Sequence, residues 1–145
     1  MRTYFAILIF TLYSGLLNAD PTAITNNNNI MTYKLQLFQD LNSGSIVDGN
    51  FDKQTEINIA QTQLQLAKAY MNEGDRKLAL ILGILARKTM QRALGNAYDP
   101  AMIPIYSILV QLYDSNVDND FPNQDQADAD KSKLYREAID HIHSE

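Results

Sequence analysis

The pattern of apolar and polar positions divides the chain into an apolar start, a polar stretch and a series of amphipathic segments. Residues 4–17 are almost uniformly apolar, and residues 20–29 (DPTAITNNNN) are polar and low in complexity. From residue 52 onward, apolar side chains recur every three or four positions, which places them on one face of a helix. The sequence therefore predicts an all-α fold whose core is assembled from helices.

The first strongly predicted helix begins after Asp52, a suitable N-cap residue, and runs to about Asn72. Gly74 suits the left-handed conformation that often follows the end of a helix. Two adjacent apolar stripes indicate its buried side. They comprise Ile57, Ala60, Leu64, Ala67 and Met71, and next to these Ile59, Leu66 and Tyr70.

A second helix is predicted from about Arg76 to Leu94, where Gly95 ends it. Residues 78–86 (LALILGILA) are apolar at every position. We therefore expect this helix to be covered on more than one side. Two helix pairs provide limited cover, so we expect one flank, formed by Ile81, Ile84 and Leu85, to stay exposed in the monomer.

Two more helices complete the predicted pairs. Asp99-Pro100 indicates a turn, and Pro104 fits only the first turn of a helix, which therefore starts near Ile103 and runs to Tyr113. After an Asp- and Asn-rich loop, the last helix is expected over residues 125–143. Its predicted buried face consists of Leu134, Tyr135, Ala138 and Ile142.

Residues 30–41 carry two competing patterns. Met31, Tyr33, Leu35 and Leu37 alternate as in a half-buried strand, whereas Ile30, Lys34, Leu37 and Leu41 repeat as in a helix. A single strand would have no partner in a helical fold. We favour an extra N-terminal helix, followed by a loop at Asn42-Ser-Gly-Ser and Asp48-Gly-Asn.

The N-terminus has the order of features found in a secretory signal peptide. Arg2 precedes the apolar run, and the small Ala19 ends it. We predict cleavage after Ala19, a disordered leader over residues 20–29 and a single helical domain over residues 30–145. The apolar run is too short to span a bilayer, which takes about 20 residues, so no membrane span is expected after cleavage.

Charge and cysteine content narrow the class of partner. The chain has a net charge of −5 and no cysteine, and removing residues 1–19 takes away only Arg2, which gives −6. An acidic domain without a basic patch argues against nucleic acid and anionic membrane surfaces. Plentiful Asn without an Asn-x-Ser/Thr sequon favours a bacterial protein, either periplasmic or secreted.

Residues that carry catalysis are sparse. His141 and His143 are the only histidines, and their spacing of two residues places them on different faces of a helix, unlike a zinc pair. We expect them to complement the negative end of the last helix. Neither a nucleophile–base pair nor a phosphate-binding Gly-rich loop is visible. We predict that the protein is not an enzyme and has no cofactor.

One segment resembles a calcium loop. Oxygen-bearing side chains recur between the last two helices with the spacing of an EF-hand, at Asp114, Asn116, Asp118, Asp120 and Asp125. Asn119 stands in place of the loop's glycine, and Asp125 is shorter than its terminal Glu. A solvated connector explains the same composition and is preferred. A calcium-dependent helix-loop-helix module remains the alternative function.

The two middle helices resemble a tetratricopeptide repeat. Leu66-Ala67-x-x-Tyr70 is followed by Gly74, Ala79 and Ala86 at the spacing of that motif, although Gln63, Gly83 and Gln91 depart from it. The second helix pair resembles the same pattern, with its motif residues at Tyr106, Leu109, Val110, Tyr113, Tyr135 and Ala138.

This resemblance implies a right-handed stack of two helix pairs that presents a groove to another protein chain. In such folds the first helix of each repeat lines the concave face. The corresponding residues here would be Gln61, Leu64, Lys68, Met71, Ser107, Gln111 and Asp114. The limited cover of residues 78–86 also predicts a second chain at this helix or at the groove beside it, either a different protein or another copy of this one. The expected function is that of an exported scaffold or adaptor for protein–protein interaction in the cell envelope.

Overall fold

The fold is all-α, as the sequence predicted. The computed structural model describes residues 27–47, 49–114 and 124–144. In this part of the chain five α-helices follow one another: α2 (Asn27–Ser43), α3 (Lys53–Asn72), α4 (Arg76–Leu94), α5 (Ile103–Asp114) and α6 (Gln124–Ser144). The predicted signal peptide and residues 20–26 of the predicted leader lie outside the described residues.

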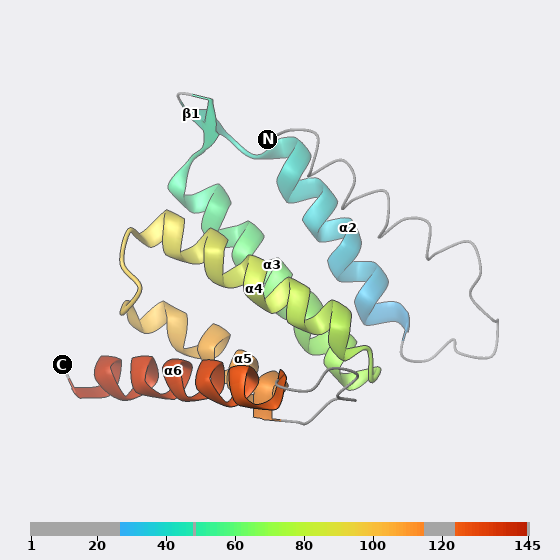
Figure 1. Ribbon diagram of the computed structural model, residues 1–145. Coiled ribbons are helices and arrows are strands. Elements are labelled where there is room, and N and C mark those ends of the chain that lie inside the picture. Colours follow the sequence, from blue (N-terminus) through green and yellow to red (C-terminus); the bar gives the residue numbers. More distant parts are fainter. Residues whose placement is uncertain (1–26, 48, 115–123, 145) are drawn as a thin grey trace.

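The ambiguous segment before the first predicted helix pair is helical. Helix α2 packs against α3 through the buried side chains of Ile30 and Leu37 (Figure 1). The helix begins at Asn27, so the expectation of a disordered leader is wrong for residues 27–29. The apolar side chains of α2 hold this helix against α3, and the helix begins about one turn before the first of them, Ile30.

A small hairpin, not predicted, connects α2 to α3. Strands β1 (Ile46–Val47) and β2 (Asn50–Phe51) pair antiparallel, with Ile46 opposite Phe51. Gly49 in the turn has a φ of +81°, a conformation that glycine adopts without strain. Of the residues predicted to form a loop, Gly49 and Asn50 belong to this hairpin, Asn42 and Ser43 still belong to α2, and Asp48 lies outside the described residues.

The predicted helix boundaries are confirmed by their caps. The Asp52 carboxylate accepts a hydrogen bond of 2.7 Å from the backbone N–H of Thr55, at the start of α3. Gly74, between α3 and α4, has a φ of +84°, and Gly95, at the end of α4, has a φ of +68°. A short 3₁₀ helix, η2 (Pro100–Met102), leads into α5, which begins one residue before Pro104.

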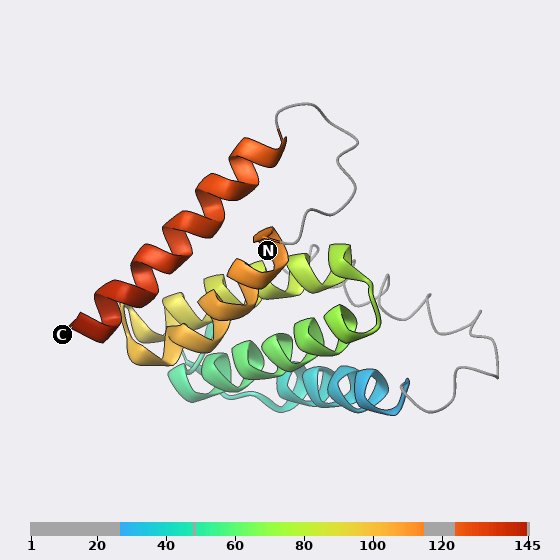
Figure 2. The ribbon, with the colours of Figure 1, turned by 90° about the horizontal axis from the view of Figure 1, so that it is seen from below.

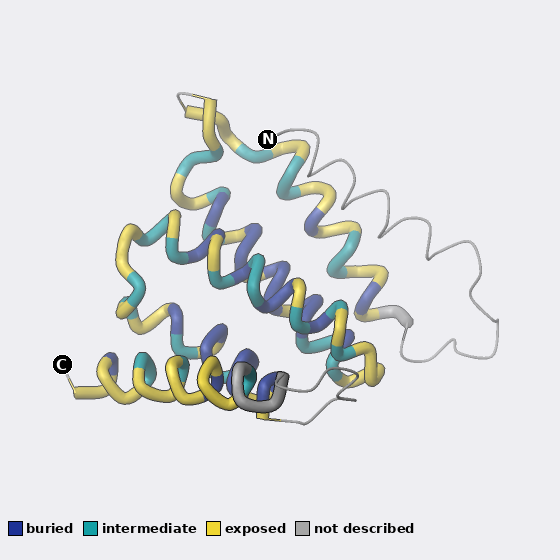
Figure 3. The backbone as a smooth tube through the Cα atoms, in the orientation of Figure 1, coloured by how far each residue is buried: buried dark blue, intermediate teal, exposed yellow. Residues whose placement is uncertain are grey.

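Helices α3, α4 and α5 share one hydrophobic core. Its largest fully buried side chains come from all three helices and from η2: Ile59, Leu66, Leu82, Met102, Ile105 and Leu109. Figure 3 shows these helices as the part of the fold with most of the buried positions. The second helix pair therefore packs on the first, rather than forming a separate unit.

The apolar helix α4 is covered on two sides, by α3 and by α5. Ala79, Leu82 and Ala86 are buried, while Ile81 keeps 47% of its surface exposed. The expectation of an exposed flank holds for Ile81 alone. It is wrong for Ile84 and Leu85, which are half-buried, and Ile84 packs against the core.

Helix α6 packs on α5 through aromatic rings. The Tyr135 ring stacks on Tyr106 with centroids 5.4 Å apart and on Tyr113 at 6.0 Å. The prediction for Leu134 is wrong, since 60% of its surface is exposed. At about 100° per residue, Leu134 lies at the edge of the stripe that Tyr135, Ala138 and Ile142 form. With α5 as the main neighbour of α6, that edge remains in solvent.

Helices α2 and α6 lie at opposite edges of the fold. Figure 2 shows α2 beside α3 at one edge, α5 and α4 in the middle, and α6 at the other edge. One long face of each of these two helices therefore has no neighbouring helix among the described elements.

Candidate binding site

A hollow of about 660 Å³ lies between α2, α3 and the start of α5. Helices α2 and α3 form its two long walls, and η2 with the first turn of α5 closes one side. Its lining comprises Tyr33, Gln36, Asp40, Asn58, Gln61, Thr62, Leu64, Gln65, Lys68, Met90, Ala101, Pro104 and Ile105.

The lining combines an apolar floor with a rim of uncharged amides. Leu64, Met90 and Ile105 are buried side chains that reach the floor from three different helices. Around them stand the amide side chains of Gln36, Asn58, Gln61 and Gln65, all of them exposed. An amide side chain both donates and accepts hydrogen bonds, so the rim can pair with neutral polar groups of either kind.

The two charged groups of the lining differ in their surroundings. The Asp40 carboxylate accepts hydrogen bonds from the Thr62 hydroxyl at 2.9 Å and from the Gln36 amide at 2.8 Å. The bond from Thr62 joins α2 to α3, whereas the bond from Gln36 lies within α2 and holds the carboxylate in place. Lys68 is half-buried and forms no ion pair among the described residues. The one cation of the hollow is therefore available to a ligand.

Three of the seven predicted partner-binding residues line this hollow. Gln61 is exposed at its rim, Leu64 contributes to its floor and Lys68 stands at its α3 wall. Met71 lies at the end of α3, half-buried against the core, and is not part of the lining. The structure thus places three of the four α3 residues in one hollow.

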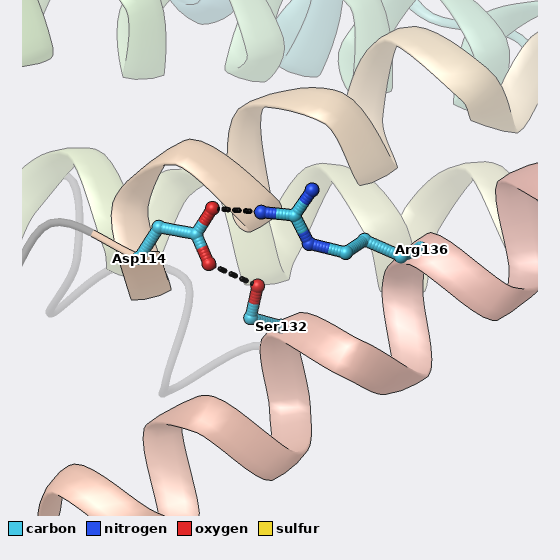
Figure 4. Close-up of polar contacts among 3 residues, drawn as sticks. All are labelled: Asp114, Ser132 and Arg136. Carbon is cyan, nitrogen blue, oxygen red and sulfur yellow. Dashed lines mark hydrogen bonds and ion pairs between the residues drawn. The ribbon is translucent and has the colours of Figure 1, made fainter.

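The other three predicted residues lie on α5, outside the hollow. Ser107 is half-buried, and its hydroxyl donates a hydrogen bond of 2.8 Å to the carbonyl of Ile103. Gln111 is exposed. Asp114 ends α5, where its carboxylate binds the Ser132 hydroxyl and the Arg136 guanidinium of α6 (Figure 4). These α5 positions and the α3 positions do not form one pocket.

Asp114 bears directly on the calcium alternative. Both of its carboxylate oxygens are already bonded, one to Ser132 and one to Arg136. An Arg partner competes with a cation for the same oxygens, because it neutralises the carboxylate charge. Asn116, Asp118 and Asp120 lie outside the described residues, and so does the side chain of Asp125. Among the described residues, Asp114 therefore joins α5 to α6 through these two bonds.

A second, smaller hollow of about 350 Å³ lies between the end of α4, α5 and α6. Four of its ten lining residues carry rings, namely Tyr98, Tyr106, Tyr135 and His141. The Tyr106 hydroxyl donates a hydrogen bond of 2.7 Å to the carbonyl of Ala97, and burial raises the pKa of Tyr106. These contacts fix the turn before α5 and join the helix pairs, which is a structural role.

The two histidines lie at the C-terminal end of α6, where the sequence placed them. His141 and His143 both lie in the last turn of α6, and the His141 ring meets the Tyr98 ring edge-on with centroids 4.5 Å apart. Within the described ranges, no three His, Cys, Asp or Glu side chains gather as a potential metal site. None of the described helices combines the length and apolar character needed to cross a bilayer.

Comparison with known proteins gives no relative from which a site can be transferred. No protein-family model matches the chain, and no curated protein or solved structure is significantly similar to it. The site therefore has to be interpreted from its own geometry.

Sequence reasoning missed the contribution of α2 to the hollow. Tyr33, Gln36 and Asp40 follow one another at helical spacing along this helix. Once α2 is recognised as a helix, that spacing predicts a polar stripe beside the apolar one. Its position opposite the polar face of α3 depends on how the two helices pack, which the pattern of one helix does not specify.

Proposed function

We propose that this protein is an exported, non-enzymatic scaffold that holds a segment of another polypeptide in the hollow between α2, α3 and α5. The observation that carries the proposal is the lining itself, an apolar floor ringed by uncharged amides. The resemblance of α3 and α4 to a tetratricopeptide repeat supports the same proposal, since the expected groove residues Gln61, Leu64 and Lys68 belong to this lining.

The chemistry of the lining favours a polypeptide over other ligands. A peptide backbone presents alternating N–H and C=O groups, and amide side chains satisfy both. The floor offers space for one or two apolar side chains, and a pocket of this size lies within the range of ligand sites, about 300–1,000 Å³. A single lysine in the lining is too little charge for nucleic acid, which needs several phosphate contacts.

The lone cation suggests a preference within that class. Lys68 stands at one wall of the hollow without an ion-pair partner among the described residues, so a carboxylate on the bound segment would gain a charge-assisted contact. Segments that combine an apolar side chain with an acidic group should therefore bind best.

Random-peptide phage display on immobilised residues 20–145 tests the proposal. Enriched peptides should carry apolar and acidic residues and should bind Gln61→Trp at least about tenfold more weakly, since the indole would occupy the rim of the hollow. Lys88→Trp, a matched change at an exposed position of α4, should leave binding unchanged. Failure to enrich any peptide, or equal binding to Gln61→Trp, would refute this site.

The export part of the proposal has its own test. The full chain expressed in a bacterial host with intact secretion should yield an envelope protein whose N-terminus is Asp20. Mass spectrometry that finds Met1 retained on the exported protein would contradict cleavage after Ala19.

A further inference from the structure

Helix α2 carries a second apolar stripe on the side that faces away from the fold. Met31, Leu35 and Phe38 keep 38%, 52% and 49% of their surfaces exposed. Their spacing of four and three residues places them on one face of the helix. At about 100° per residue this face is about 120° from the stripe through which Ile30, Tyr33, Leu37 and Leu41 contact the core.

The outer stripe lies at an edge of the fold with no described helix beside it. Figures 1 and 2 both show α2 as the outermost helix on its side. Single exposed apolar residues are ordinary in soluble proteins, whereas a contiguous row on an edge helix is typical of an interface. An amphipathic helix with two apolar faces buries one in its own core and offers the other to a neighbour.

Charge identifies the kind of neighbour that fits. Lys34 and Asp40 are the only charged residues of α2, and both are engaged on its inner side. The Lys34 ammonium lies over the Tyr70 ring, 5.6 Å from its centroid, and Asp40 accepts the hydrogen bonds from Gln36 and Thr62. The outer stripe is flanked on one side by Thr32, Gln39 and Asn42, which are exposed and uncharged, and on the other by Lys34, which is half-buried and whose ammonium lies over Tyr70. The exposed side chains of this face therefore carry no charge that would repel a second copy.

The exposed isoleucine of α4, Ile81, differs from the α2 stripe because lysines lie on the same helix face. Ile81 on α4 has Lys77 four positions before it and Lys88 seven positions after it, on the same helix face, and both lysines are exposed. Pairing this face with itself would bring lysines together. The mature chain is acidic, with a net charge of −6 once residues 1–19 are removed, and its uncharged α2 face lets two copies approach with little local repulsion.

We propose that two copies of the mature protein associate through this outer face of α2, with the two helices antiparallel about a two-fold axis near Leu35. In a two-fold symmetric contact both copies use the same surface, so each would contribute the same three side chains to the interface. Leu35 meets its symmetry mate, and Met31 of each copy meets Phe38 of the other. This association is independent of what the hollow binds.

Sedimentation of residues 20–145 tests self-association. The wild-type protein should sediment with twice the monomer mass at micromolar concentration. Leu35→Asp should be monomeric with unchanged circular dichroism, since the side chain is half exposed. Ile81→Asp, a matched charge at an exposed apolar position, should stay dimeric. A monomeric wild-type protein, including one that binds a different protein through this face, would overturn the proposal, as would a dimer that Leu35→Asp leaves intact.

Disulfide cross-linking tests the geometry even if the aspartate variant fails to fold. The chain has no cysteine, so an introduced one reports only on itself. Leu35→Cys should form a covalent dimer under mild oxidation. Met31→Cys and Phe38→Cys should cross-link when mixed but not alone, because the antiparallel arrangement separates equivalent residues by about 10 Å along the axis, beyond disulfide reach. Cross-linking of Met31→Cys with itself, or none with Leu35→Cys, would contradict this arrangement.

Discussion

Gly83 of α4 lies against Leu109 of α5, at the contact between the two helix pairs. This contact provides a quantitative test of the stacked fold. A Cβ atom on Gly83 would stand 3.0 Å from Cδ2 and 3.7 Å from Cγ of Leu109. Leu109 has no exposed surface and so has little freedom to move away. Gly83→Val therefore forces an overlap that Leu109→Ala should relieve.

The expected magnitudes follow from the volumes. Gly83→Val should destabilise by about 1–3 kcal/mol through overpacking, less a few tenths recovered because valine favours the helix more than glycine. Leu109→Ala should cost about 2–5 kcal/mol, because it leaves a cavity in the core. Valine adds as many carbon atoms as the leucine truncation removes, so the double variant should be more stable than the sum predicts by about 1–2 kcal/mol.

Urea unfolding of residues 20–145 followed by circular dichroism measures all three variants against the wild type. Tyrosine fluorescence serves as a second probe, since the chain contains no tryptophan. Additive changes, within about 0.5 kcal/mol, would show that the two side chains do not share a contact. The stacking of the second helix pair on the first would then have to be abandoned at this point.

Three further outcomes are expected. Gly44→Ala should destabilise the fold by about 1–3 kcal/mol in thermal or urea unfolding, because the added Cβ would lie 2.3 Å from the Thr55 methyl and 2.8 Å from the Asp40 carbonyl oxygen. Adding Thr55→Ser, which removes that methyl, should recover part of the lost stability. An unchanged unfolding midpoint for Gly44→Ala would contradict this packing. The hydrogen bond from the Thr55 backbone N–H holds the pKa of Asp52 below its ordinary value of 3.8. The ionised cap therefore stabilises the fold fully at a pH above 3.8, and this stabilisation is lost as the pH falls through the lowered pKa of the folded state. Asp52→Ala should therefore lower Tm at pH 7 and converge with the wild type in acid, whereas Asp52→Asn should change little; a gap that persists in acid would refute the assignment. Burial raises the pKa of Tyr113 to about 12, so one tyrosine should ionise late in an ultraviolet titration, stability should fall as pH rises from about 10 through 12, and Tyr113→Phe should remove the late phase.

The helix boundaries could be predicted because local chemistry decides them. Asp52 caps α3, the left-handed glycines at 74 and 95 end α3 and α4, and Pro104 can stand only in the first turn of α5. Each of these signals acts within a few residues of the chain. The pattern of residues 30–41 was less decisive, yet the lack of a partner for a single strand was sufficient to favour the helix.

The errors concern positions whose burial depends on a neighbouring helix. Leu134 is apolar and lies beside a buried stripe, but α6 has its main neighbour on one side only. Ile84 was expected to be exposed, and the neighbouring helix pair covers it. The hairpin before α3 was missed because two-residue strands leave too short a pattern to recognise.

The same distinction explains the candidate site. The resemblance to a tetratricopeptide repeat placed Gln61, Leu64 and Lys68 at a groove, and all three line one hollow. Its other wall comes from α2, and its closed side comes from η2 and the start of α5. Which side chains of these elements meet the α3 residues depends on helix packing, so the α2 wall was not foreseen and the predicted α5 residues fall outside.

Helix α2 links the two proposals through the directions of its faces. At about 100° per residue, its hollow-lining side chains Tyr33, Gln36 and Asp40 point about 160° away from the centre of the Met31, Leu35 and Phe38 stripe. A dimer formed through that stripe therefore leaves both hollows open, facing outward on opposite sides of the pair. Two weak sites held in one particle bind a repetitive or multivalent partner more tightly than either site alone, without any added contact. Loss of the dimer through Leu35→Asp should then leave the affinity for a single peptide unchanged and weaken only binding to a surface that displays the peptide densely.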